Sequence, residues 1–325
     1  MASEIGIARD QGAEVAWRAV LAAAAIAEHI AGAQTVGAFA LEADGTLKTV
    51  PAGDPQAIVA WQPGSGWRPL LPADDSRTSL LDLYLPICSA TAARPVTVGH
   101  LGQSLDGFIA THAGDSQFVT GHENILHLHR MRALCGSVVV GAGTVAADDP
   151  QLTTRLVHGP SPLRVIFDPE RRLARDYRVF TDGAAPTLYA CARSLVERGE
   201  TQFGCASIVA LDDEGGPANV VELMRLLRAR GCSRVFVEGG GVTVSAFLEA
   251  NLLDRLQVAI APLIIGNGRP AIRLPARATL SDCPRPQYRV FKMGGDVLFD
   301  CELTPGDDAA VDKSGGRAHP VSRII

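Results

Sequence analysis

Hydrophobic and polar positions follow two different patterns along the chain, and the pattern changes near Val96. Before that point, residues 14–30 form an alanine-rich apolar stretch that predicts a buried helix, and residues 36–50 have the pattern of a hairpin centred on Asp44-Gly45. After it, short β-branched runs alternate with amphipathic segments, which is typical of an α/β domain with a mostly parallel sheet. We therefore predict a small N-terminal α+β addition followed by an α/β domain.

The same periodicities predict the elements of the α/β region. Strands are expected at residues 96–101, 137–140, 163–167, 187–190, 207–211, 234–237 and 255–261, helices at 121–133, 218–230 and 242–250, and a hairpin-like pair at 288–292 and 296–301. In the helix over 218–230, the apolar face is expected to hold Val221, Leu223, Met224 and Leu227, with Gly231 ending the helix. The chain thus divides into the addition over 1–92, the α/β domain over 93–303 and a flexible polar tail over 304–325.

Composition and charge narrow the classes of function. The 325 residues are enough for a large core, and 47% hydrophobic with 20% charged residues is ordinary for a globular enzyme. A net charge of −5 provides no basic surface for nucleic acid, so we expect no nucleic-acid partner. The whole acidic excess lies in residues 1–92, where we find no catalytic constellation and favour a packing or oligomerisation module.

Cysteine spacing and hydropathy indicate where in the cell the protein is expected. The seven cysteines include no C-x-x-C pair, which predicts reduced thiols in the cytoplasm and no metal site. No stretch reaches the roughly 18 apolar residues of a membrane helix. The run over 19–27 follows acidic residues, whereas a signal peptide has positive charge before its apolar core. We expect a cytoplasmic protein without a membrane partner.

The stretch over 137–155, SVVVGAGTVAADDPQLTTR, is the first candidate ligand site. A buried strand that runs into glycines and then charged groups is how an open α/β sheet presents a ligand at a strand's carboxyl end, although a strand with a tight turn has the same pattern. Gly141, Gly143 and Ala146 have the G-x-G-x-x-A spacing of a dinucleotide fingerprint. Because Asp148-Asp149-Pro150 leave no room for a long helix, we reject a Rossmann unit but keep backbone N–H groups near a ligand.

Glu238-Gly239-Gly240-Gly241, between a predicted strand and a predicted helix, is a better candidate for a phosphate cradle. Glycines let the backbone approach a ligand closely, and the helix start offers unpaired N–H groups and a positive dipole end. Glu238 is a poor neighbour for phosphate and suits amine or hydroxyl groups of a ligand. The alternative, a glycine turn needed for tight helix–sheet packing, stays open.

Arginines flank the strand over 137–140. The guanidinium groups of Arg130, Arg132 and Arg155 suit a phosphate or carboxylate, and the alternative is that they are surface arginines in an arginine-rich chain. Asp106, before Gly107, has the position of a turn residue.

Three histidines lie in the predicted helix over 121–133. His122 and His129 are two helical turns apart, about 10 Å, which is wrong for a metal site, so we interpret them and His127 as solvated helix histidines. The chain has no G-x-S-x-G, no Walker A lysine and no zinc-deaminase pattern. Two glycine-rich strand ends with arginines favour a nucleotide-type cofactor and a phosphorylated substrate.

At this point the motifs resemble a known family. They are SLDG (104–107), GDS (114–116), GAGTVAADDPQLTTR (141–155), RVIFD (164–168), VEGGG (237–241) and APLIIG (261–266). In order and spacing over about 95–303 they resemble the reductase domain of riboflavin biosynthesis, a member of the dihydrofolate-reductase-like superfamily. The fold that this implies is a mixed, mostly parallel sheet flanked by helices, and most members form homodimers.

The resemblance implies an NADPH-dependent oxidoreductase that converts 5-amino-6-(5-phosphoribosylamino)uracil to its ribitylamino product by hydride transfer to C1′. The cofactor contacts that it implies are Gly102, Phe118, Thr144, Asp148, Gly240, Gly241, Val242 and Thr243. The substrate contacts that it implies are Ser116, Arg132, Leu152, Arg155 and Glu238. No residue is assigned as an indispensable acid or base, because hydride transfer is the cofactor's chemistry and the protein mainly orients the reactants.

Three departures from the family pattern qualify this reading. Phe118 stands where members often have Trp, and keeps an apolar wall without the indole donor. His100 stands where members often have Lys, so its charge is expected to depend on pH. Residues 1–92 lack the zinc ligands of the deaminase that precedes many bacterial reductases, so we expect no deaminase activity. The departures motivate two alternatives: a paralogue that reduces another pyrimidine or a pterin, and a non-catalytic nucleotide-binding protein.

Overall fold

Seven parallel strands form the centre of a ten-stranded sheet in the computed structural model, which describes residues 11–34, 36–213 and 215–303. The predicted tail over 304–325 lies outside the described residues. In spatial order the parallel strands are β11 (Ala206–Leu211), β9 (Thr187–Ala192), β8 (Leu163–Phe167), β7 (Ser137–Gly141), β12 (Arg234–Glu238), β5 (Val96–Ser104) and β13 (Arg255–Ala261). Burial on both faces explains their nearly continuous apolar runs, and the predicted mostly parallel sheet is confirmed.

Antiparallel strands extend the sheet at both edges. β16 (Asp296–Glu302) pairs with β13, and β15 (Gln287–Met293) pairs with β16. The turn between them passes through Gly294, whose φ is +62°, so the predicted hairpin is confirmed. At the other edge β10 (Gln202–Phe203) pairs with β11.

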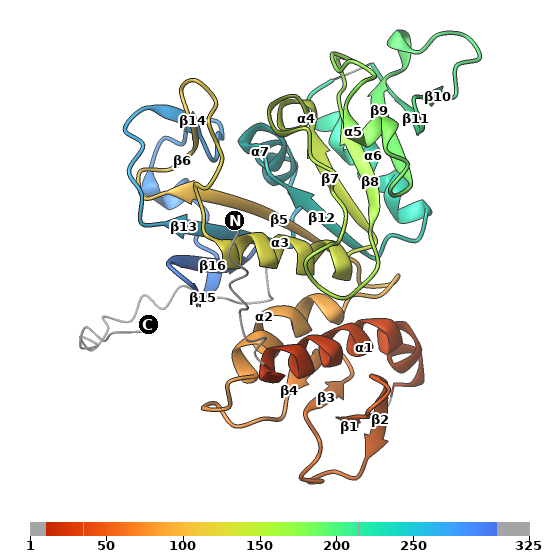
Figure 1. The fold of residues 1–325 in the computed structure, drawn as a ribbon, viewed down its shortest axis with the longest axis vertical. Helices are drawn as coiled ribbons and strands as arrows, with labels where there is room; N and C mark the ends of the chain where they lie inside the picture. The colour runs from red at the N-terminus through yellow and green to blue at the C-terminus, as the bar shows by residue number, and fades with distance from the viewer. Residues whose placement is uncertain (1–10, 35, 214, 304–325) are drawn as a thin grey trace, which may run out of the picture.

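Smaller elements follow the carboxyl ends of the strands. A separate two-stranded sheet stands beside the end of β5 and consists of β6 (Phe108–Thr111) and β14 (Gly268–Pro270) (Figure 1). The short helices are α4 (Ala142–Asp148), α5 (Arg178–Thr181), η1 (Arg193–Leu195) and η2 (Leu280–Asp282). The loops that carry them leave the same edge of the sheet at which a ligand site is expected.

Alternate residues of the central strands join two different hydrophobic cores. In β7, Val138 and Val140 belong to one cluster and Val139 to the other, and in β12 Phe236 and Val237 are divided in the same way. The longer helices that cover the faces are α3 (His122–Leu134) on the first and α6 (Pro217–Ala229) and α7 (Gly241–Glu249) on the second. Period-two alternation therefore divides the strand residues between two layers of helices.

The helix α6 corrects one sequence expectation. Leu223, Met224 and Leu227 are buried as predicted, and Gly231 follows the helix with a φ of +81°. Val221, however, is 49% exposed, and Val220 takes its place in the core. The predicted face is therefore right except at this one position, because two adjacent valines are equally apolar and only packing chooses between them.

The N-terminal unit, residues 11–92, consists of two helices and a four-stranded antiparallel sheet. Its elements are α1 (Gln11–Ala33), β1 (Gly37–Leu41), β2 (Leu47–Val50), β3 (Val59–Gln62), β4 (Gly66–Pro69) and α2 (Thr78–Cys88), with the strands in the order β2-β1-β3-β4. The predicted alanine-rich helix and the hairpin around Asp44-Gly45 are both present. In Figure 1 the two helices lie between this sheet and α3 of the larger sheet.

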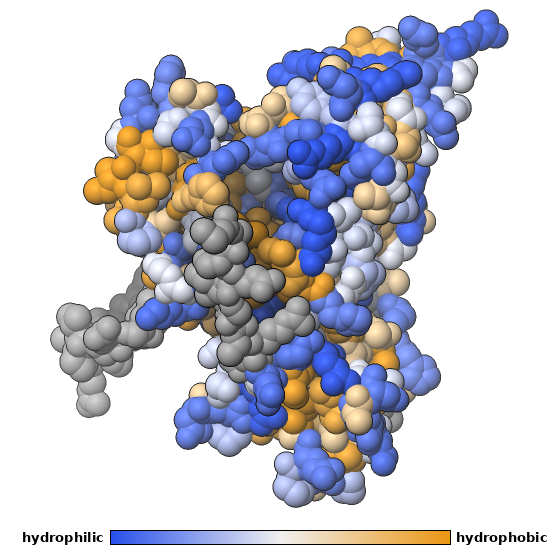
Figure 2. Space-filling view, in the orientation of Figure 1, coloured by the Kyte–Doolittle hydropathy of each residue, from blue (hydrophilic) through white to orange (hydrophobic). Residues whose placement is uncertain are grey.

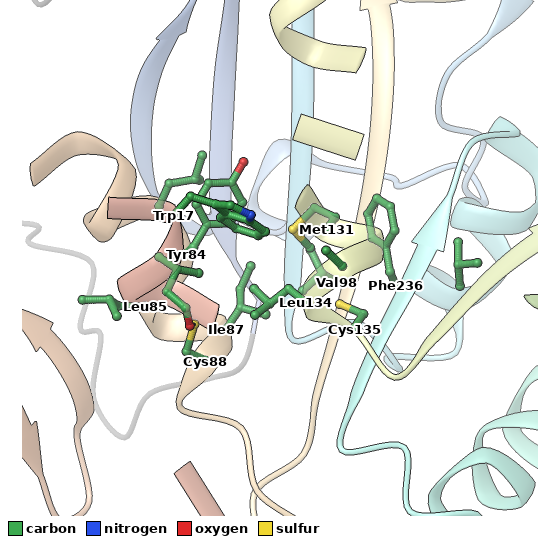
Figure 3. Packing of buried hydrophobic residues seen from close by; sticks show 14 of the residues in the cluster. Trp17, Tyr84, Leu85, Ile87, Cys88, Val98, Met131, Leu134, Cys135 and Phe236 are labelled. Atoms are coloured by element: carbon green, nitrogen blue, oxygen red, sulfur yellow. The ribbon is translucent and has the colours of Figure 1, made fainter. Parts of the chain in front are cut away.

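The N-terminal unit shares a hydrophobic core with the rest of the chain. Trp17 and Tyr84 from α1 and α2 lie in the same cluster as Met131 of α3 and Phe236 of β12 (Figure 3). By length and composition alone, α1 is apolar enough to cross a membrane. In this fold its apolar residues are core residues, because Trp17 and its alanine-rich face are buried against α2 and α3.

Candidate functional site

A cavity of about 1160 Å³ lies at the carboxyl edge of the parallel strands. Its lining comes from the loops after six neighbouring strands, β11, β9, β8, β7, β12 and β5. The hollow opens between the β6–β14 lobe and the lobe that carries β8 and β9 (Figure 2). This is the edge at which open α/β sheets bind ligands.

Eight of the thirteen residues predicted to bind cofactor or substrate line this cavity. They are Gly102, Ser116, Thr144, Asp148, Gly240, Gly241, Val242 and Thr243. They come from four separate stretches of sequence, so the fold brings together residues that the sequence alone could only group by motif.

The glycine turn before α7 is shaped by close packing. Gly239 and Gly240 have φ of +64° and +61°, and a Cβ on Gly240 would lie 2.7 Å from Oγ1 of Thr144. A Cβ on Gly241 would lie 2.2 Å from the carbonyl oxygen of Ala271. Thr243 is the first donor of the helix, and its N–H bonds the Gly240 carbonyl at 3.0 Å. The turn therefore packs tightly, as the second interpretation expects, and it also lines the cavity. Ligand binding at the turn stays a prediction.

A short helix follows β7 where the fingerprint-like glycines stand. α4 covers Ala142–Asp148 and ends at Asp149, whose φ of +39° is left-handed. This agrees with the expectation that no long helix fits before Pro150. Thr144 and Asp148 are one turn apart on the cavity side of α4, and Oγ of Ser116 donates to Oδ1 of Asp148 at 3.0 Å.

An arginine–glutamate pair is buried beside the cavity. Nε of Arg132 donates to Oε2 of Glu238 at 2.8 Å, and a second bond joins Nη2 to Oε1, which gives a bidentate pair. Nη1 of Arg132 also approaches the carbonyl of Thr153 at 3.4 Å. Glu238 is followed directly by Gly239, which lines the cavity, so the pair adjoins it.

Arg155 extends this cluster and leaves it cationic. Its Nη1 donates to Oγ1 of Thr153 at 2.6 Å, and its backbone N–H donates to Nδ1 of His129 at 3.0 Å. In the described part of the chain no carboxylate forms a salt bridge with Arg155. Burial first, and then the charges of Arg132 and Arg178, lower the pKa of Arg155, while Glu238 opposes the shift. A phosphate would relieve this repulsion.

Two of the three helix histidines are buried, which corrects the prediction that they are solvated. His122 is exposed, but His127 and His129 are 0% and 3% exposed. Burial lowers the pKa of both to about 4, with help from Arg132 and Arg155 at His129. His127 lies between Tyr84 of α2 and Gln257 of the sheet, and His129 is covered by the loop that carries Arg155.

His100 is also buried, so the expectation that its charge varies near neutral pH is wrong. It is 2% exposed, and desolvation, followed by the neighbouring His127, lowers its pKa well below the usual range. Among the described residues neither of its ring nitrogens has a hydrogen-bond partner. A neutral imidazole therefore stands where the family often has a charged lysine.

Five predicted contacts lie outside the cavity lining: the cluster of Arg132, Arg155 and Glu238 beside it, and Phe118 and Leu152, whose side chains point elsewhere. Phe118 is 84% exposed with a φ of +64°, so it forms no wall of the cavity in this structure. Leu152 is 1% exposed with a φ of +57° and belongs to the hydrophobic core beside Arg132. Backbone conformation, which sequence motifs do not reveal, decides where these side chains point.

Sequence reasoning missed the part of the cavity beyond β7. Pro169 and Arg172 follow β8, Ser194 follows β9, and Asn219 is in α6. Oδ1 of Asn219 is buried and has no partner within the described part of the chain. The first three follow the carboxyl ends of predicted strands, which is a signal that the sequence contains; Asn219 has no such signal.

Comparisons with known proteins agree with this geometry. The model of the RibD C-terminal domain family matches residues 96–283. The 2,5-diamino-6-ribosylamino-4(3H)-pyrimidinone 5′-phosphate reductase of Methanothermobacter thermautotrophicus is 34% identical over 182 residues, which cover 55% of this chain and 82% of that protein. The riboflavin biosynthesis protein RibD of Bacillus amyloliquefaciens is 32% identical over 209 residues, which cover 63% of this chain and 56% of that protein.

A solved structure shows the same fold. The diaminohydroxyphosphoribosylaminopyrimidine deaminase/5-amino-6-(5-phosphoribosylamino)uracil reductase of Thermotoga maritima has a TM-score of 0.55 and 28% identity, covering 70% of this chain and 60% of that chain. The chain thus spans more than half, but less than two thirds, of the length of these two bacterial proteins.

Proposed function

The chain belongs to the RibD C-terminal domain family, and from this membership and the cavity we propose that it is an oxidoreductase of riboflavin biosynthesis. Its reaction is the reduction of 5-amino-6-(5-phosphoribosylamino)uracil to the ribitylamino product. The observation that carries the proposal is the cationic cluster of Arg132, Arg155 and Glu238 directly beside a glycine-lined cavity. A phosphorylated substrate and an extended cofactor can meet at that boundary.

The shape of the cavity supports a dinucleotide cofactor. Six neighbouring strand ends with a spacing of about 4.8 Å extend over about 24 Å, which suits an extended ligand better than a small one. The N–H groups at the start of α7 would hold a pyrophosphate on the cavity side of Gly240 and Thr144. The nicotinamide must then lie toward Glu238, and the adenosine toward Arg172 and Ser194.

We assign NADPH rather than NADH on the strength of Arg172. In the proposed arrangement its guanidinium, 62% exposed, would lie at the adenosine end; Nε is 3.3 Å from Oε2 of Glu170 and 3.7 Å from Oδ1 of Asp168. A guanidinium can bind a 2′-phosphate through several hydrogen bonds. When bound, NADPH would supply the hydride, and Thr144, Asp148 and the glycine turn would orient it.

Coenzyme preference tests this assignment. Arg172→Ala should lower kcat/KM for NADPH about tenfold and change that for NADH little, since one charged contact is lost. The matched control is Arg193→Ala, an exposed arginine that pairs with Asp212. Equal losses with both coenzymes would remove Arg172 from 2′-phosphate recognition.

The substrate side follows from the charges of the cluster. Arg155 and Ser116 bind the phosphate, and Glu238 accepts hydrogen bonds from amine or hydroxyl groups of the pyrimidine or ribose. Arg132 neutralises Glu238 and fixes its orientation by the bidentate pair. Leu152 and Phe118, both predicted contacts, are expected to approach the ligands only if their loops move on binding.

The decisive experiment is NADPH oxidation by the purified protein. We expect turnover with 5-amino-6-(5-phosphoribosylamino)uracil and restored growth of a reductase-deficient riboflavin auxotroph. NADPH binding without turnover would favour a paralogue for another pyrimidine or a pterin, and absence of binding would contradict both enzyme functions. The expectation of no deaminase activity stays a prediction, which incubation with the diaminopyrimidinone and no cofactor tests.

The proposal includes a homodimer and a cytoplasmic location. Apolar side chains gather on the β6–β14 lobe (Figure 2), where Leu105 is 61% and Ile264 73% exposed, so we place a homodimer contact there. All seven cysteines, each within the described residues, are free thiols, as expected in the cytoplasm. Light scattering of the wild type and of Ile264→Asp tests the dimer: a mass of two chains for the first and one for the second is expected.

A further inference from the structure

The two segments that bear the substrate-side arginines both contact the N-terminal unit. Tyr84 of α2 is hydrogen-bonded to Nδ1 of His127 in α3, the helix of Arg132, with the atoms 2.6 Å apart. Nε1 of Trp17 in α1 donates to the carbonyl of His158 at 2.8 Å, three residues after Arg155. Two aromatic side chains of a unit outside the family match therefore contact the two segments that carry Arg132 and Arg155.

Tyr84 stands at the end of a buried chain of hydrogen bonds in which the donor and the acceptor of each bond can be assigned. Asp300, paired with Arg255 and Arg289, can only accept, so Nε2 of Gln257 faces it at 3.2 Å. Oε1 of Gln257 then accepts from Nε2 of His127 at 2.9 Å. Nδ1 of His127 is left as an acceptor, and the Tyr84 hydroxyl must donate to it.

Trp17 and Tyr84 also support each other. Their rings meet edge to face with centroids 5.5 Å apart, and each is 1% exposed. The guanidinium of Arg130, in α3, lies 5.8 Å from the centroid of the Trp17 ring. Figure 3 shows Trp17 and Tyr84 next to each other, facing Met131 of the same helix. The two rings therefore pack together at the junction of α1, α2 and α3.

The cofactor side of the site has no such support. Among the residues that the structure describes, no hydrogen bond or ion pair joins residues 14–91 to α4 or to the glycine turn over 239–243. Among these residues, the polar contacts of the N-terminal helices thus reach the segments of the substrate half of the site and not those of the cofactor half.

We propose that Trp17 and Tyr84 are positioning residues for the substrate half of the site, which makes the N-terminal unit a scaffold for catalysis. They fix the position of α3 relative to the loop after Arg155. In that position Arg132 orients Glu238, and Arg155 presents its guanidinium to a phosphate. The inference rests on the proposed function for the identity of the substrate. A displacement of about 1 Å at such a site is enough to change turnover strongly.

Conservative variants in the full chain test the proposal. Tyr84→Phe and Trp17→Phe keep an aromatic ring and remove one hydrogen bond each. We expect KM for the ribosylaminouracil phosphate to rise about tenfold, the scale of one hydrogen bond in a buried network, with the Kd of NADPH unchanged. A merely structural role would weaken both ligands or neither.

Two variants of the same kind serve as controls. Trp61→Phe shrinks a buried indole in the same unit whose Nε1 has no partner among described residues, and Tyr288→Phe removes an exposed hydroxyl. Both should keep the wild-type KM. An unchanged KM in both test variants, or an equal rise in Trp61→Phe, would overturn the proposal.

A measurement without turnover separates this inference from the proposed function. Calorimetric titration with ribose 5-phosphate as the probe reports on the phosphate-binding half alone. If the wild type binds the probe but does not oxidise NADPH, the proposed function fails, and weaker probe binding in Tyr84→Phe still supports the positioning role. If the wild type does not bind the probe, or Tyr84→Phe binds it as tightly as the wild type, the positioning role is refuted.

Discussion

At the scale of single residues, Glu238 joins the two halves of the site. Its carboxylate is held by Arg132 on one side, and the next residue, Gly239, lines the cavity on the other. A buried pair of this kind is costly to break, because removal of one partner leaves an uncompensated charge. The pair therefore fixes one geometry at the point where the two reactants are proposed to meet.

Arg155 is expected to bind the substrate's phosphate. Arg155→Ala should raise KM for the phosphorylated substrate by about 10- to 100-fold, since a hydrogen bond to a charged group contributes about 1.5–3 kcal/mol, and should leave the Kd of NADPH unchanged. Steady-state kinetics and fluorescence titration measure the two. Arg68→Ala, an exposed arginine in β4, is the control. A KM equal to that of the wild type would exclude Arg155 from the site.

Gly240 is expected to be required for the cofactor. In Gly240→Ala the new methyl group would lie 2.7 Å from Oγ1 of Thr144 at a φ of +61°, a conformation that costs an L-residue about 1–2 kcal/mol. The Kd of NADPH should rise at least tenfold, measured by fluorescence titration. Gly32→Ala, in α1 with nothing within 4 Å of the added Cβ, should bind NADPH normally. Normal binding by Gly240→Ala would show that the turn does not approach the cofactor.

At the scale of elements, α3 is the helix whose environment the sequence misrepresents. Its polar sequence suggests one solvated face, but His127 and His129 are buried because a second layer covers the helix. The strands, in contrast, behave as their patterns predict, since apolar runs of β-branched residues are stable only when both faces are covered. Local pattern is a good guide to an element's type and a poor guide to the number of its neighbours.

The buried histidines of α3 should make the protein sensitive to acid. Their folded-state pKa values of about 4 lie below the unfolded value of about 6.5, so the unfolded chain binds more protons between these limits. Stability should be constant above pH 7 and fall as pH decreases from 6.5 toward 4. Each histidine contributes up to about 1.4 kcal/mol per pH unit.

Urea denaturation at several pH values checks this expectation. His127→Gln keeps a hydrogen-bonding side chain and cannot titrate. It should reduce the slope of the unfolding free energy against pH by the contribution of one histidine. His29→Gln, a change at an exposed histidine of α1, should leave the slope as it is. Equal unfolding free energies at pH 7 and pH 5 would contradict the burial of neutral histidines.

At the scale of the whole molecule, the N-terminal unit and the large sheet share one hydrophobic cluster. The proposed division at residue 92 stays a prediction about sequence, whereas the core crosses that boundary through Trp17, Tyr84 and Met131. A shared core couples the stability of the two parts, because neither can unfold without exposing apolar surface of the other.

The two parts are therefore expected to unfold together. All three tryptophans, Trp17, Trp61 and Trp67, lie in the N-terminal unit, so their fluorescence reports on that unit, while far-ultraviolet circular dichroism reports on the whole chain. The two transitions in urea should coincide. Leu85→Ala, at the shared core, should lower the free energy of unfolding by about 2–5 kcal/mol, as is typical of a buried leucine, and so move both midpoints to a lower urea concentration. Separate transitions would show that the unit folds independently.

The sequence by itself determined the strand and helix types, the mostly parallel sheet and the glycine turn before α7, because these follow from periodicity and from the backbone freedom of glycine. Motif order also predicted the eight residues that the fold brings to one cavity. Only the tertiary structure decided the burial of His100, His127 and His129, the exposure of Phe118 and Val221, and the contacts of Trp17 and Tyr84. The physical reason is that burial and side-chain direction depend on which distant segment covers an element, and a local pattern contains no information about that segment.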